Sequence, residues 1–103
     1  MKTFNGENLP KLKSNQFLVL QAELLTGIVL DLSGKRRFAG EARDWIVIFE
    51  NLEEAKSFAE QKVIEYPDVE CLIQNFDGQY KNRVFNTEHE RNTNVLELSL
   101  IHI

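Results

Sequence analysis

Cysteine is nearly absent from this sequence, which contains one among its 103 residues. A lone Cys71 cannot close a disulfide within the chain, so the disulfide-stapled scaffolds of small secreted proteins are excluded. Long apolar runs are missing as well. The stretch 17–32 is largely apolar but is interrupted by Gln21, Glu23 and Asp31. A signal peptide needs an unbroken run of about 7–15 apolar residues and a membrane span needs about 20. We therefore expect a cytoplasmic protein that does not associate with membranes.

Motifs that carry known chemistry are also missing. Gly34 and Lys35 do not make a phosphate-binding loop, because that motif needs a glycine five positions earlier and Ser or Thr next. Here the preceding glycine is Gly27 and the next residue is Arg36. The single cysteine and the two histidines lack the spacing of a metal site, and no Gly-x-Ser-x-Gly elbow occurs. We therefore expect no cofactor, no bound metal and no catalytic residue.

The composition fits one globular domain. A chain of 103 residues with 43% hydrophobic residues can bury one modest core without disulfides or metals. Residues 1–15 are polar and contain Gly6 and Pro10, so we expect a loose N-terminal arm there and a single domain over residues 16–103. The formal net charge of −4 argues against a nucleic-acid partner, because such proteins usually present strong positive charge.

Two regions carry strand signals. Residues 17–20 are all apolar, and residues 28–32 alternate between apolar positions on one face and Val29 and Asp31 on the other. With Thr26 and Gly27 between them, we expect two strands or one long bent strand, although 19–25 could also be helical. Residues 45–49 are aromatic or β-branched throughout, which predicts a strand covered on both faces.

One amphipathic helix follows the strand at 45–49. Its apolar positions recur at helical spacing, and they are Leu52, Ala55, Phe58, Ala59, Val63 and Tyr66. Asn51 is a favourable N-cap, and Glu54 three residues later completes a capping-box pattern. Pro67 ends the helix, because the residue before a proline is pushed out of the helical region.

A β-hairpin is expected over residues 69–85, with Asp77 and Gly78 in a two-residue type I′ turn. That turn would place Ile73 opposite Asn82 and Cys71 opposite Val84. One face of the hairpin would then belong to the core and hold Val69, Cys71, Ile73, Tyr80 and Val84. The other would be mostly solvated and hold Glu70, Leu72, Gln74, Lys81, Arg83 and Phe85. Residues 95–103 alternate in polarity and could add a last strand.

Together these patterns predict an α+β domain with a mainly antiparallel sheet of about five strands and one helix on one face. A single helix cannot shelter both faces of such a sheet, and exposed apolar patches often mark interfaces. The second face could be covered by the N-terminal arm or the C-terminal strand, by a second copy, or by another partner. We expect a non-catalytic interaction or regulatory module, acting as a homodimer or on a protein partner through the apolar sheet face, the acidic helix, or both.

Basic residues cluster in the loop after the first strands. Lys35, Arg36, Arg37 and Arg43, with Trp45 beside them, could grip a phosphate or carboxylate. An alternative function is therefore an anion-binding protein or enzyme with a pocket near residues 33–45. The competing interpretation of these charges is a solvated loop balanced by acidic groups elsewhere.

Overall fold

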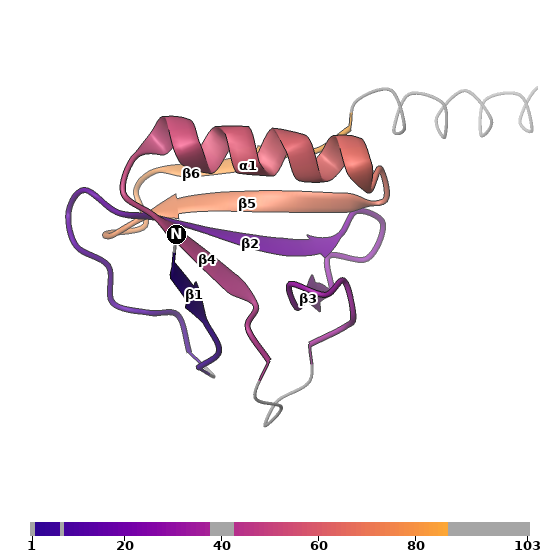
Figure 1. The fold of residues 1–103 in the computed structure, drawn as a ribbon, viewed down its shortest axis with the longest axis horizontal. Helices are drawn as coiled ribbons and strands as arrows, with labels where there is room; N and C mark the ends of the chain where they lie inside the picture. The colour runs from indigo at the N-terminus through magenta and orange to yellow at the C-terminus, as the bar shows by residue number, and fades with distance from the viewer. Residues whose placement is uncertain (1, 7, 38–42, 87–103) are drawn as a thin grey trace, which may run out of the picture.

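The computed structural model of the chain describes residues 2–6, 8–37 and 43–86. They form an open, six-stranded antiparallel sheet with one helix on one face (Figure 1), which confirms the expected α+β class. The elements in chain order are β1 (Lys2–Phe4), β2 (Phe17–Glu23), β3 (Val29–Leu30), β4 (Ile46–Phe49), α1 (Leu52–Glu65), β5 (Val69–Asn75) and β6 (Lys81–Val84). Across the sheet the strands follow the order β1-β4-β2-β5-β6, and β3 pairs with β2.

Strand β2 is the centre of the sheet. It pairs with β5 along its whole length, from Phe17 opposite Asn75 to Glu23 opposite Val69. Its other edge is shared by β4 along the first half and β3 near the end. The region 17–32 is therefore two strands, and the helical alternative for 19–25 is wrong. The chain reverses between them at Gly27, whose φ of 74° lies in the region that glycine adopts most easily.

Strand β4 is buried as predicted, because it lies between β1 and β2. Ile46 is 0% exposed and Val47 is 1% exposed, and these two side chains point to opposite faces of the sheet. Within the stretch expected to be a loose arm, residues 2–4 form β1 and pair with β4 in antiparallel register. β1 has only three residues and one apolar side chain, so its pairing depends on β4 rather than on a local pattern.

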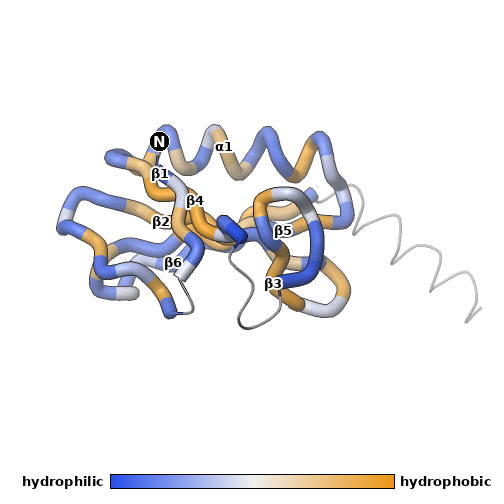
Figure 2. Tube along the Cα trace, turned by 60° about the horizontal axis from the view of Figure 1, so that its bottom comes forward, coloured by the Kyte–Doolittle hydropathy of each residue, from blue (hydrophilic) through white to orange (hydrophobic). Residues whose placement is uncertain are grey.

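Helix α1 begins and ends where the sequence predicts. The backbone N–H of Glu54 donates to Asn51 Oδ1 at 2.8 Å, and the helix ends before Pro67. The small side chains of Ala55 and Ala59 are fully buried against β2, β4 and β5, and Figure 2 shows apolar and polar residues alternating around the helix. Tyr66 leaves this apolar stripe and is 51% exposed, because its backbone is no longer helical.

The hairpin register is confirmed, with Ile73 opposite Asn82 and Cys71 opposite Val84. The type I′ prediction is wrong, because only Gly78 has a positive φ (74°) and Asp77 does not. Side-chain acceptors hold the wider turn instead. Asn75 Oδ1 accepts from the Tyr80 N–H at 3.1 Å, and Asp77 Oδ1 accepts from the Gln79 N–H at 3.1 Å.

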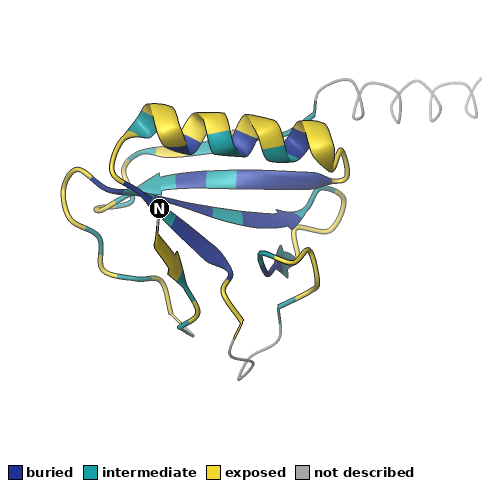
Figure 3. Cartoon of the chain, viewed as in Figure 1, coloured by how far each residue is buried: buried dark blue, intermediate teal, exposed yellow. Residues whose placement is uncertain are grey.

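A second apolar cluster lies on the face opposite α1. Leu18, Trp45 and Ile46 are buried there, and Phe4 and Leu12 from the N-terminal region cover part of the cluster. Figure 3 shows that the central strands are largely buried, whereas the outer surface of α1 is exposed. The expected last strand at 95–103 lies outside the described residues. In the part of the chain that the structure describes, no helix has the length and apolar character required to cross a membrane.

Candidate functional site

The basic loop is organised around Asp31, which is 1% exposed at the end of β3. Its Oδ1 accepts from the backbone N–H groups of Ser33 (2.9 Å) and Lys35 (3.1 Å), and its Oδ2 accepts from Arg43 Nη1 at 3.3 Å. Burial would raise the pKa of Asp31, but these hydrogen bonds outweigh that effect and the pKa is lowered. A charged carboxylate therefore ties Ser33, Lys35 and Arg43 together.

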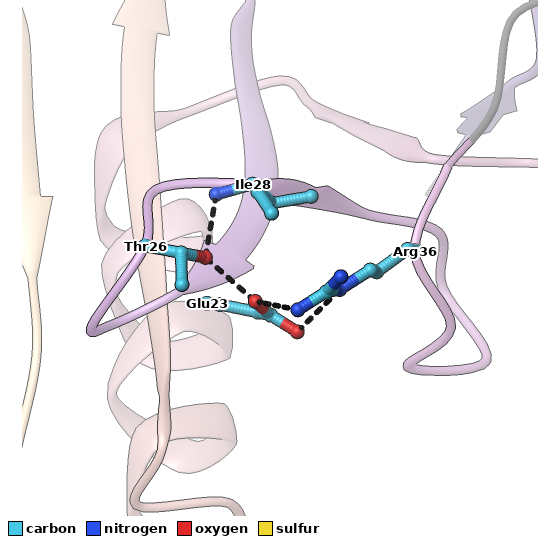
Figure 4. A network of polar contacts seen from close by, with 4 residues as sticks. All are labelled: Glu23, Thr26, Ile28 and Arg36. Atoms are coloured by element: carbon cyan, nitrogen blue, oxygen red, sulfur yellow. Dashed lines mark hydrogen bonds and ion pairs between the residues drawn. The ribbon is translucent and has the colours of Figure 1, made fainter.

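Arg36 forms a two-pronged ion pair with Glu23 at the end of β2 (Figure 4). Its Nε and Nη2 donate to the two carboxylate oxygens at 3.0 and 3.1 Å. Thr26 Oγ1 donates to the same carboxylate at 2.6 Å and accepts from the Ile28 N–H at 3.2 Å. The hydrogen bonds from Arg36, and next those from Thr26, keep the pKa of Glu23 below its usual value. This network ties the β2–β3 turn to the basic loop.

Arg37 and Trp45 hold the N-terminal segment. The guanidinium carbon of Arg37 lies 4.3 Å from the Trp45 ring centre, within the range of a cation–π contact. Arg37 Nη2 and Trp45 Nε1 both donate to the carbonyl oxygen of Gly6, at 3.0 and 2.7 Å. Trp45 is only 6% exposed, so its indole is part of the second apolar cluster rather than of an open pocket wall.

The structure thus brings the five expected binding residues into one region and gives most of them partners within the chain. Arg36, Arg37, Arg43 and Trp45 all bond to protein oxygens, and the exposed Lys35 side chain has no such partner among the described residues. A depression beside Arg43 is also walled by two carboxylates, those of Asp31 and Asp44. In this arrangement most of the basic side chains bond to groups within the described part of the chain.

Among the described residues, the sheet face opposite α1 is only partly covered. Leu20, Ile48 and Leu72 point to this side and each keeps part of its surface exposed. Cations flank them, because register places Lys2 next to Ile48 and Arg83 next to Leu72, and Lys81 lies on the same edge strand as Arg83. We call this surface, made by Leu20, Ile48 and Leu72 with Lys2, Lys81 and Arg83 at its edges, the open face.

A hollow of about 190 Å³ lies within the open face between β2 and β5. Leu18, Leu20, Leu72 and Ile73 contribute apolar lining, and Gln74 and Lys81 contribute polar lining. Glu70, expected to be solvated on this face, is buried (7% exposed) and ion-paired to Arg83. Phe85 is also partly buried, with the Arg83 guanidinium carbon 4.5 Å from its ring centre.

A second cavity, of about 260 Å³, lies at the C-terminal end of α1 and was not predicted from the sequence. Gln21 of β2, Leu32 and Ser33 of the basic loop, Lys62 and Tyr66 at the helix end, and Asp68 before β5 contribute to its walls. Gln21 is 3% exposed, and its amide nitrogen has no hydrogen-bond partner among the described residues. The sequence feature that could have indicated this cavity is Gln21, the one polar residue in the run from Phe17 to Ala22.

Groups for nucleophilic or metal chemistry do not gather in the described part of the chain. Cys71 is fully buried, and burial raises the pKa of its thiol to about 12. No group of three His, Cys, Asp or Glu side chains there could hold a metal ion. Comparisons with protein-family models, with curated proteins and with solved structures found no match to this chain. The case for function therefore rests on its own surfaces.

Proposed function

We propose that this protein is a non-catalytic interaction module whose open face binds an acidic segment of a protein partner. The observation that carries the proposal is the incomplete cover of the face opposite α1. Leu20, Ile48 and Leu72 remain partly exposed there, while their counterparts on the helix side, such as Val19 and Ile73, are 0% exposed. This difference in burial between the two faces of the sheet fits a surface that another molecule covers.

The apolar part of the open face supports affinity. Fully burying a large aliphatic side chain contributes about 1.5–3 kcal/mol relative to leaving it exposed. Leu20, Ile48 and Leu72 are already partly buried, so a partner that covers them gains only the remaining fraction of that energy at each position. The hollow between β2 and β5 is close in size to one large side chain. A partner that inserts one aromatic or aliphatic residue beside Leu20 and Leu72 would place its anchor at the centre of the contact, where binding energy concentrates.

The charged part of the open face selects an acidic partner. Lys2 and Lys81 are exposed at its two edges and form no ion pair among the described residues, and Arg83 is exposed beside Lys81. Among the strand residues on this face the one carboxylate is that of Glu70, which already pairs with Arg83. A symmetric dimer through this face would bring the lysines of both copies to one interface, which is unfavourable. An acidic partner is therefore favoured over the homodimer.

A peptide-display selection tests the proposal. A library of random 12-residue peptides is selected on the full-length protein, and the enriched peptides are measured against charge-reversal variants. We expect enriched peptides to carry more Asp and Glu than Lys and Arg, around one large apolar residue. Lys81→Glu should weaken their binding about fivefold, because one exposed ion pair is lost and the new carboxylate repels the acidic peptide. Lys56→Glu, an equal charge change on the exposed helix surface, should leave binding unchanged.

A second pair of variants tests the apolar contact. Leu72→Asp places a charge in the hollow and should abolish binding, whereas Ile64→Asp, at a helix position that is 67% exposed, should not. Circular dichroism confirms that each variant is folded. Peptides that bind the Lys81→Glu and Leu72→Asp variants as well as the original protein would refute the proposal. A dimer in sedimentation that Leu72→Asp dissociates would refute it too, by assigning the face to a second copy.

A further inference from the structure

We propose that the cavity at the C-terminal end of α1 binds a small monocarboxylate with a short apolar body. This inference goes beyond the interaction module, because the cavity lies at the helix side of the sheet and shares no described wall with the open face. Its walls come from β2, the basic loop, the end of α1 and the segment before β5. Long-range folding therefore assembles a concave site that no local sequence motif marks.

Gln21 provides the first reason. Its side chain points to the α1 side of β2, as Val19 does, and it pairs across the sheet with Cys71 and Leu30. An apolar side chain would be expected at such a position. Its amide nitrogen is instead buried without a hydrogen-bond partner among the residues that the structure describes, a condition that native proteins largely avoid. A carboxylate oxygen in the cavity would accept the hydrogen bond that no described residue accepts.

Lys62 provides the second reason. It contributes to the cavity wall from the last turn of α1 and forms no ion pair with any described residue. Its ammonium nitrogen lies 5.8 Å from the Phe58 ring centre and 5.3 Å from the Tyr66 ring centre, beside aromatic carbon rather than a carboxylate. Lys62 and Gln21 are thus two donors, one of them charged, on the walls of the same cavity.

The remaining walls limit the ligand. Leu30, Leu32 and Val69 are apolar, and the volume of about 260 Å³ is just below the range of about 300–1,000 Å³ that is usual for ligand pockets. Glu23 on the rim is already neutralised by Arg36, but Asp68 adds a carboxylate. One cation facing one anion disfavours a dianion such as phosphate. A single carboxylate on a short aliphatic chain matches both the donors and the size.

Titration of the ¹⁵N-labelled full-length protein with 4-methylpentanoate, at constant ionic strength, tests the inference by NMR. We expect saturable shifts of the Gln21 side-chain amide and of the backbone amides of Ser33 and Tyr66. Lys62→Met should weaken binding about tenfold and Gln21→Met about three- to tenfold. Lys56→Met, which removes an exposed lysine elsewhere on α1, should leave binding unchanged.

Two related compounds test whether the carboxylate charge is required for binding. 4-Methylpentanamide keeps the shape and loses the charge, and 3-methylbutylamine reverses the charge, so both should bind at least about tenfold more weakly. Equal binding of the amide or the amine would overturn the proposal. Shifts that stay linear up to about 20 mM acid, a concentration close to the weakest useful affinity, would mean that water alone fills the cavity and would also overturn the proposal. The open face is probed by different variants, so either proposal can fail alone.

Discussion

Replacing Gln21 by methionine should make the protein more stable. The Gln21 side chain is 3% exposed and its amide nitrogen is buried without a hydrogen-bond partner among the described residues, so folding buries a donor that no described group compensates. Such a loss costs about 1–3 kcal/mol. Methionine has a similar length and an unbranched shape, and it fills the site without a polar group. We therefore expect the free energy of unfolding to rise by about 1–2 kcal/mol.

Gln16→Met is the matched control, because Gln16 is also buried, at 7% exposed, but both its side-chain nitrogen and its side-chain oxygen form hydrogen bonds. Its Nε2 donates to Glu50 Oε1 at 3.1 Å, and its Oε1 accepts from the Lys13 N–H at 2.8 Å. The same substitution there should lower the free energy of unfolding by about 1–3 kcal/mol. The two variants are thus expected to move in opposite directions.

Urea unfolding followed by fluorescence measures both variants. Trp45 is the sole tryptophan and is buried in the native protein, so its emission reports the transition. At unchanged slope m, the midpoint should rise for Gln21→Met and fall for Gln16→Met. The melting temperature should rise by about 4–8 °C per kcal/mol. If Gln21→Met lowers the midpoint as Gln16→Met does, the Gln21 amide is bonded in the native state and the reasoning about the cavity fails.

Three further predictions follow from single groups. Asp31→Asn should lower the free energy of unfolding by about 1–3 kcal/mol at pH 7. Because the pKa of Asp31 is lowered in the folded state, this difference from the original protein should persist above about pH 4 and vanish as the pH falls through the folded-state pKa. Urea unfolding measured at a series of acidic pH values checks this. Cys71 should react with iodoacetamide at pH 8 only on global unfolding, because burial raises the pKa of its thiol to about 12. Mass spectrometry at increasing urea concentration measures the labelling, and fast labelling of the native protein would contradict this prediction. Asn51→Ala should cost about 0.5–2 kcal/mol through the lost N-cap, measured by the urea midpoint, and no change would argue against the 2.8 Å bond to Glu54.

The elements that sequence reasoning predicted well are those with local signals. α1 has its cap at Asn51 and its stop at Pro67 within 17 residues of chain, so neighbouring residues decide its limits. The hairpin register also followed from the turn position, even though Asp77 does not adopt the positive φ that a type I′ turn requires. Hydrogen bonds to the side chains of Asn75 and Asp77 stabilise a different turn, which turn propensities alone do not predict.

The parts that sequence reasoning missed depend on distant segments. β1 has no local strand pattern and exists through its pairing with β4, more than 40 residues away. The basic loop looked like a cluster of free charges, because Glu23 and Asp31 do not adjoin it in a recognisable motif. Only the folded chain shows that Arg36 and Arg43 are paired. Likewise, Gln21 and Lys62 share a cavity only after β2 and α1 pack together.

Solvent access to the methyl groups of the sheet tests the open face most directly. The full-length protein, methyl-labelled at Leu, Ile and Val, is measured by NMR with a soluble gadolinium chelate that broadens exposed protons. We predict strong broadening for Leu20, Ile48 and Leu72, and weak broadening for Val19 and Ile73 beneath α1. Equal protection of both sets would show that the chain or a second copy already covers this face, and it would contradict the proposed docking of an acidic partner.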